Sequence, residues 1–313
     1  MLATISDIAN LASLTPAQAL GIPVALVGSV FLALGAQFQH RGVNKVDAAT
    51  APEDKAGLNL GQLVSLARRP SWLIGTLMLG LAIVFQLVSL YLAPLTVVQP
   101  LGAVALVITS IVNARVSKTK LDGPSIRAII FCVGGVGLFV TIAALTTSSP
   151  AIHDTQLRVV ATILAVVLVV LALVFAFFRK RFTTIFYIVG AGILFGFVAT
   201  LAKVVIDRVH TLFESGFHLV TGDWLTIVCV VGLILAALLG SYFVQTAYSS
   251  GPPDLVVAGL TVVDPLVGVS IGIIVLGEAA TAPLWAAFAF VVAGAIAIYG
   301  VFQMAKHHPQ IRR

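Results

Sequence analysis

Long apolar runs separated by short polar stretches dominate the chain. Because the hydrocarbon core of a bilayer is about 30 Å thick, a helix of roughly 20 apolar residues spans it. Lipid offers no partner to an unpaired backbone group, so each such run predicts one transmembrane helix. Nine runs have this size: 17–39, 70–92, 95–114, 126–145, 159–178, 183–206, 224–246, 255–275 and 284–302. Residues 60–69 predict a short amphipathic helix along the membrane interface.

The composition supports an all-α integral membrane protein, formed as a single membrane domain over residues 1–313. Hydrophobic residues make up 59% of the chain and charged residues 10%, whereas about 25% of an ordinary soluble protein is charged. The net charge of +6 does not indicate a nucleic-acid partner, because the basic residues lie between apolar runs. Cys132 and Cys229 fall within apolar runs and indicate neither a disulfide framework nor a metal cluster.

The basic residues predict how the chain is oriented in the membrane. If alternate loops lie on opposite sides, one side holds 15 of the 18 Lys and Arg residues, and the other holds Arg158, Lys203 and Arg208. Positive charge is retained in the cytoplasm. We therefore expect the N-terminus outside and the C-terminus inside, with residues 305–313 as a cytoplasmic tail. The expected location is the cell membrane, with the bacterial plasma membrane as the first choice.

A short string occurs twice, as L-T-V-V-Q-P at 95–100 and as L-T-V-V-D-P at 260–265. The third and eighth predicted helices, which carry the two copies, cross the membrane in opposite directions. This predicts an inverted repeat of the 4+5 type, with a first repeat at 15–146, a connecting helix at 157–178 and a second repeat at 183–304. Inverted repeats are typical of secondary transporters, whose substrate site lies near the midplane and is exposed to either side in turn.

The layout resembles the drug/metabolite transporter superfamily, in which two related halves each carry an apolar hairpin with a central proline and a Gly-Glu ending. The second half fits this pattern with Asp264-Pro265 and, later, Gly277-Glu278. The first half departs from it, because residues 116–120 read V-S-K-T-K where the Gly-Glu is expected.

The nine-helix count is more similar to the NIPA-type magnesium transporter branch of that superfamily. In this branch the first helix ends in small residues followed by basic residues and Gly, as residues 35–42 do here, and a Lys recurs where Lys203 stands. The resemblance implies transport by alternating access.

Asp264 is the main candidate for a functional site. It lies about nine residues into its predicted helix, and therefore about 13 Å deep and near the midplane. A carboxylate at that depth is costly unless it is paired, protonated or hydrated. One interpretation is a coupling-proton or cation site, and the other is a protonated acid that bonds a neighbouring helix at the Pro265 kink. We favour the first, because intramembrane acids are usually functional.

Other polar groups at membrane depth are weaker candidates for substrate binding. An uncharged amide either lines a cavity or bonds a neighbouring helix, and this choice stays open for Gln99, Gln86, Gln37 and Gln245. Lys203 lies one turn before Asp207, so it either receives an anionic substrate or, in the interpretation that we favour, snorkels outward and pairs with that acid.

Three further polar positions have structural interpretations. Asp254 is expected as the N-cap of the eighth helix, Glu278 as a solvated loop acid, and His40 and Arg41 as topology charges.

The leading functional hypothesis is a secondary transporter of a small solute, coupled to protons through Asp264. The alternative is a NIPA-like transporter of magnesium or another divalent cation, with Asp264 as a metal ligand. The scarcity of intramembrane acids favours the solute carrier, because hard divalent cations prefer several oxygen ligands. A lipid-translocating protein is a third possibility.

An enzyme is not expected, because no H-E-x-x-H or G-x-S-x-G motif occurs. No cofactor is expected beyond a coupling proton or a magnesium ion. A homodimer stays open.

Overall fold

The computed structural model describes residues 15–47, 69–116, 122–178, 184–214, 223–250 and 253–306, and every regular element in them is an α-helix. Within these residues, nine spans are long and apolar enough to cross a membrane, as predicted, and α5 and α6 together form one of them. The helices are α2 (Pro16–Asp47), α4 (Pro70–Leu92), α5 (Leu95–Leu101), α6 (Ala103–Val116), α7 (Gly123–Thr146), α8 (Asp154–Phe178), α9 (Thr184–Glu214), α10 (Asp223–Ser250), α11 (Pro253–Ile274) and α12 (Leu284–Lys306).

The start of α2 follows from its sequence. Thr15 Oγ1 accepts a hydrogen bond from the Gln18 backbone N–H, and the Gln18 side chain accepts one from the Thr15 backbone N–H, both at 3.3 Å. This reciprocal pair is a capping box, which satisfies two N–H groups that the helix leaves unpaired. Helices α2 and α9 end about eight residues later than predicted. Most of the amphipathic segment expected at 60–69 lies outside the described residues.

The third transmembrane span is not the uninterrupted helix that its apolar run predicted. Pro100 has no N–H to continue the helical ladder, and α5 ends at Leu101, with Gly102 as a turn before α6. The Leu101 carbonyl accepts a hydrogen bond of 3.1 Å from the Ser29 hydroxyl of α2. The result is a seven-residue helix, α5, that is joined to α6 through a break and is buried along its whole length.

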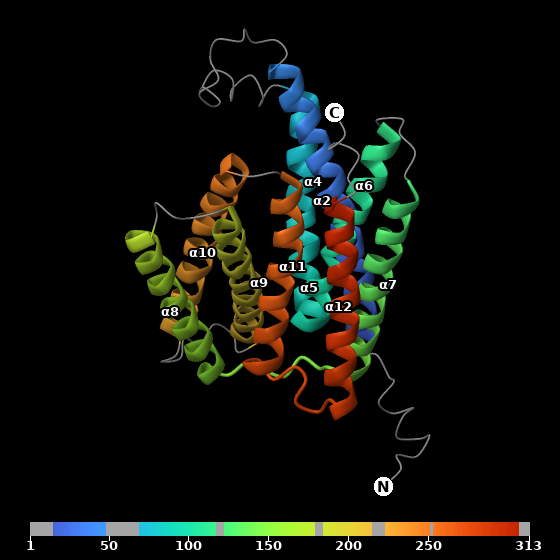
Figure 1. The fold of residues 1–313 in the computed structure, drawn as a ribbon. Helices are drawn as coiled ribbons and strands as arrows, with labels where there is room; N and C mark the ends of the chain where they lie inside the picture. The colour runs from blue at the N-terminus through green and yellow to red at the C-terminus, as the bar shows by residue number, and fades with distance from the viewer. Residues whose placement is uncertain are drawn as a thin grey trace.

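The long helices pack in pairs around a central region that holds α5 and α11 (Figure 1). Helix α2 packs against α4, α9 against α10, and α7 against α12, while α11 contacts α9, α5 and α12. Helix α8 lies at the edge of the bundle beside α10 (Figure 1). Only 11% of the α8 span is buried, so most of its apolar surface faces lipid.

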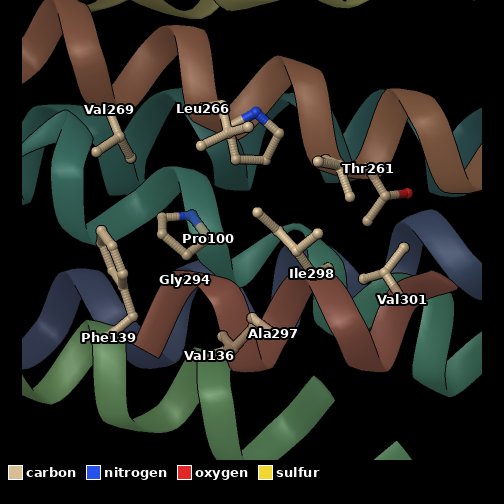
Figure 2. Close-up of a pocket in the computed structure, with 13 residues that line it drawn as sticks. Pro100, Val136, Phe139, Thr261, Leu266, Val269, Gly294, Ala297, Ile298 and Val301 are labelled. Atoms are coloured by element: carbon tan, nitrogen blue, oxygen red, sulfur yellow. The ribbon is translucent and has the colours of Figure 1, made fainter. Parts of the chain in front are cut away.

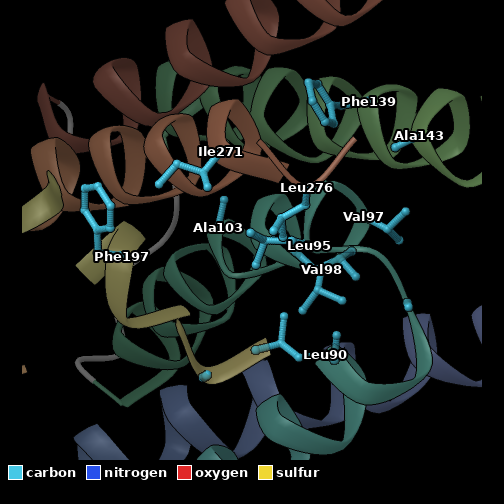
Figure 3. Packing of buried hydrophobic residues seen from close by; sticks show 14 of the residues in the cluster. Leu90, Leu95, Val97, Val98, Ala103, Phe139, Ala143, Phe197, Ile271 and Leu276 are labelled. Carbon is cyan, nitrogen blue, oxygen red and sulfur yellow. The ribbon is translucent and has the colours of Figure 1, made fainter. Parts of the chain in front are cut away.

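Several nearly fully buried side chains gather around the corner where α4 ends and α5 begins. Leu90, Leu95, Val98 and Leu276 are each at most 1% exposed, and Figure 3 shows them among the buried side chains of this region. A fully buried leucine contributes about 1.5–3 kcal/mol through the hydrophobic effect in water-soluble proteins. In a membrane this contribution is much smaller, because lipid is as apolar as leucine. Apolar packing alone therefore does not hold this corner in place, and polar contacts are needed as well.

Glycines allow the very close approach of α7 and α12. A Cβ added at Gly135 would overlap the Ala297 backbone nitrogen and lie 2.7 Å from the Ala297 Cα atom, and one added at Gly300 would overlap the Cys132 backbone. Small residues of this kind let transmembrane helices pack backbone to backbone.

We therefore predict that Gly135→Ala destabilises the protein, by about 1–3 kcal/mol as expected for overpacking. Gly134→Ala is the matched control, because a Cβ at Gly134 meets nothing within 4 Å. Thermal unfolding in detergent micelles, followed by size-exclusion chromatography, measures both variants. Equal melting temperatures for the two variants would contradict the packing argument.

Candidate functional site

The corner between α4 and α5 leaves several backbone groups without helical partners. A helix end exposes four carbonyls and a helix start exposes four N–H groups, and here only two residues separate an end from a start. Pro94 carries no N–H, so the Leu90 carbonyl lacks its usual donor four residues later. In a membrane such groups need partners from elsewhere in the protein.

Glu278 supplies the partners for the start of α5. Its carboxylate accepts hydrogen bonds from the Leu95 N–H at 2.7 Å, the Thr96 N–H at 2.8 Å and the Thr96 hydroxyl at 2.5 Å. The Glu278 side chain is fully buried. It is therefore an N-terminal cap for α5 that comes from the opposite end of the sequence, and the expectation of a solvated loop acid is wrong.

The loop after α11 brings Glu278 into this position. Gly277 has a φ of 73°, a conformation that glycine adopts without steric cost, and the Glu278 N–H then donates to the Gly272 carbonyl at 3.0 Å. A Cβ at Gly272 would lie 2.8 Å from Glu278 Oε2 and 3.1 Å from Thr96 Oγ1. Both glycines are therefore needed for the carboxylate to reach α5.

Lys203 supplies the partner for the end of α4. Its ammonium group donates to the Leu90 carbonyl at 2.8 Å and the Ala93 carbonyl at 3.1 Å, and it lies 3.5 Å from the Ser149 hydroxyl. The residue is only 5% exposed. The expectation that Lys203 snorkels outward to pair with Asp207 is wrong, because Asp207 instead accepts a hydrogen bond from the Ile152 N–H at 3.3 Å.

The charges of both residues match the helix ends that they contact. A carboxylate is favourable at the positive end of a helix dipole, and an ammonium group is favourable at the negative end. Glu278 lies at the start of α5 and Lys203 at the end of α4. We refer to these two residues and the backbone groups that they bond as the corner clamp.

A second polar region lies deeper in the bundle, where α11 passes between α5 and α9. In the part of the chain that the structure describes, Oδ1 of Asp264 and Nε2 of Gln99 are both buried without a hydrogen-bond partner. The Gln99 amide lies against Gly268, where a Cβ would come within 3.0 Å of its Cδ atom. Gly268 is one helical turn beyond Asp264 on α11. Gln99 and Asp264, the polar residues of the two copies of the duplicated string, therefore lie on helices that contact each other.

Two glycines of α9 allow the backbone of α11 around Asp264 to pack closely against α9. A Cβ at Gly196 would lie 3.1 Å from the Asp264 carbonyl oxygen, and one at Gly192 would lie 3.3 Å from the Asp264 nitrogen. Both would also overlap side chains of α11, at Val267 and Val263. The Gly192–Gly196 pair is therefore the packing face that brings the backbone of α11 against α9.

The duplicated strings occupy different places in their helices. Leu95 starts α5, whereas Leu260 lies seven residues after the start of α11 at Pro253. Asp264 is consequently about 16 Å along its helix and Gln99 only about 6 Å along its own. Thr96 is free to bond Glu278 at a helix start, while Thr261 donates to the Val257 carbonyl of its own helix at 2.8 Å.

An apolar cavity of about 70 Å³ lies between the central helices and the α7–α12 pair. Figure 2 shows residues of α5, α7, α11 and α12 around it. Pro100 and Pro265, the prolines of the two copies, both line it, whereas Gln99 and Asp264 are not among its lining residues. The cavity therefore adjoins the polar region without containing it.

The remaining predicted residues do not gather at one place. Gln86 of α4 and Gln37 of α2 are half-buried, and Gln245 of α10 is exposed. Asp254 is the second residue of α11, which begins at Pro253, and the expectation that its side chain caps this helix stays a prediction. The side chains of Asp254, His40 and Arg41 lie outside the described part of the structure. Among the described residues, no group of three or more His, Cys, Asp or Glu side chains is arranged to hold a metal ion.

The corner clamp predicts different effects for the two copies of the same threonine. Thr96→Val removes a hydrogen bond to a buried carboxylate, so we expect a loss of about 1.5–3 kcal/mol of stability. Thr261→Val removes only a bond to its own helix, which contributes little. Thermal unfolding in detergent measures both variants, and a Thr261→Val protein that melts as low as Thr96→Val would contradict the assigned role of Thr96.

Comparison with known proteins places the chain in a family. It is 27% identical to an uncharacterized protein of Corynebacterium glutamicum, over 261 residues that cover 83% of this chain and 85% of the relative. No solved structure matches it. Residues 17–248 match the family described as "Magnesium transporter NIPA", which leaves Asp264 and Glu278 beyond the matched region. Because this match covers far more than half of the sequence, the chain belongs to the NIPA magnesium transporter family and is a multi-pass membrane transporter.

Proposed function

We propose that this protein carries a divalent cation, magnesium first, across the membrane by alternating access, with Asp264 as the carboxylate on the cation's path. The observation that carries this proposal is the buried Oδ1 atom of Asp264, which has no hydrogen-bond partner among the described residues. Such a group at membrane depth is costly to retain, and a passing cation would compensate the cost.

The scarcity of intramembrane acids favoured a solute carrier over a magnesium transporter, and the family match reverses this order. A single carboxylate is too little for a closed metal site, but magnesium sheds its water reluctantly and is bound through one or two carboxylates while it keeps several water molecules. Asp264 supplies one such ligand, and the Gln99 amide lies close to the same part of α11. The residues present therefore fit a hydrated magnesium ion as cargo.

The pairing of the helices supports alternating access. In the predicted repeat, the first four spans (α2, α4, α5–α6 and α7) match the last four (α9, α10, α11 and α12). The contact of α2 with α4 then corresponds to that of α9 with α10, and the contact of α2 with α6 corresponds to that of α9 with α11. This recurrence is expected of a repeat over 15–146 and 183–304, and the opposite directions predicted for the two copies of the string would make the repeat inverted. In such repeats one half moves against the other around a central site.

A second candidate function is proton-coupled transport of a small apolar solute, as in the wider drug/metabolite transporter superfamily. The cavity beside Pro100 and Pro265 favours it, because that cavity is lined almost wholly by apolar side chains. In this case Asp264 would bind and release the coupling proton. The transporter family favours both candidates over an enzyme.

We predict that Asp264→Asn lowers magnesium uptake by at least tenfold in proteoliposomes that record internal magnesium and internal pH together. The substitution keeps the size of the side chain but removes its charge. Asp154→Asn is the control, since that carboxylate pairs with Arg208 at 3.2 Å, and uptake should stay within about twofold of wild type, the scale of a few tenths of a kcal/mol.

Two outcomes would change this assignment. Normal magnesium uptake by a monodisperse Asp264→Asn protein would remove Asp264 from the cation path. Proton movement that depends on an added solute, without magnesium flux in the wild type, would replace the magnesium proposal with the solute carrier.

A further inference from the structure

The corner clamp joins the two predicted repeats at one end of the bundle. Glu278 bonds α5, and Lys203 bonds the end of α4, so both side chains come from residues 183–304 while their backbone partners lie within 15–146. The Glu278 carbonyl also accepts a hydrogen bond of 2.9 Å from the Ser148 N–H, just after α7. If the N-terminus is outside, this end of the bundle faces outward.

The other contacts between the halves have a different character. Helices α7 and α12 meet through Gly135 and Gly300, and the space between α5, α11 and α12 is an apolar cavity. Apolar surfaces can separate toward lipid or slide without leaving a polar group unpaired. The clamp cannot do so, because opening it would release two N–H groups, two carbonyls, a carboxylate and an ammonium group at once.

The clamp is also linked to the polar region through α5. This helix has seven residues, begins at the clamp and ends at the Gly102 break. Thr96, which Glu278 holds, precedes Gln99 by three residues, and Gln99 lies against Gly268 of α11. Thr96 and Gln99 lie one helical turn apart on this short helix, which continues into α6 through a locally tightened turn at Gly102. Release of Thr96 at the helix start is therefore transmitted to Gln99 and its contact with α11.

We propose that Glu278 and Lys203 form the latch that closes the transporter on its predicted outer side, and that α5 couples this latch to the site around Asp264. The proposal rests on the alternating access proposed above but does not depend on the cargo. With the clamp formed, that side is closed and its groups are dry. With the clamp broken, water enters to hydrate the released backbone and charged groups, and the pathway opens outward.

The test is the reactivity of a cysteine buried beside the latch. Val98 is 1% exposed and lies on the second turn of α5, so Val98→Cys is placed in a chain with Cys132→Ala and Cys229→Ala. The protein is reconstituted in lipid nanodiscs and reacted with a charged, membrane-impermeant maleimide. The reaction is run well below the melting temperature of each protein variant. With the latch intact, labelling of the new cysteine should be slow.

We expect Glu278→Gln and Lys203→Met each to speed this labelling at least tenfold. Thr96→Val removes one of the three hydrogen bonds to the Glu278 carboxylate, so it should speed labelling less than the other two variants. It keeps the proposal testable if those variants do not fold. Asp154→Asn is the control: its carboxylate pairs with Arg208 at 3.2 Å and makes none of the clamp's hydrogen bonds, so it should leave labelling unchanged.

Variants that melt at lower temperature but keep the cysteine unreactive would overturn the latch, because the clamp would then only stabilise the fold. Equal acceleration by Asp154→Asn would overturn it as well. Magnesium uptake by the wild type is measured separately and without the reporter cysteine. A failure of the cargo assignment is therefore distinguishable from a failure of the latch.

Discussion

The hydrogen bonds at the corner between α4 and α5 are the constraint on which the rest of the structure depends. Two helix ends meet there in the membrane, and Pro94 adds to the unpaired backbone groups. The Glu278 carboxylate and the Lys203 ammonium group satisfy them from the other half of the protein. The cost of burying each of these two charges is therefore offset, because each meets a helix end of opposite partial charge.

This arrangement gives different roles to two copies of nearly the same string. In α5 the string begins the helix, so its threonine is available to Glu278 and its glutamine points into the packing with α11. In α11 the string lies in mid-helix, so its threonine bonds its own backbone and its aspartate lies deep in the bundle. The same local sequence thus supplies a fixed end in one half and a candidate cation ligand in the other.

The family and the geometry together favour a transporter whose polar groups are few but each at a defined place. Asp264 and Gln99 lie next to the prolines that border an apolar cavity. One carboxylate is a weak basis for binding a bare divalent cation and a reasonable one for guiding a hydrated ion. The small number of acids argues against a closed magnesium site, but it is compatible with a magnesium ion that retains its water.

The sequence by itself determined the nine membrane spans found among the described residues and most of their boundaries, because the cost of unpaired backbone groups in lipid makes a long apolar run sufficient evidence for a helix. It also singled out Asp264 and Gln99 as candidate site residues, since a polar residue before proline is conspicuous in an apolar run. Only the tertiary structure decided the roles of Lys203 and Glu278, whose partners are backbone groups 110 and 183 residues away. Backbone carbonyls and N–H groups occur at nearly every position, so no sequence pattern marks which ones a distant charge will find.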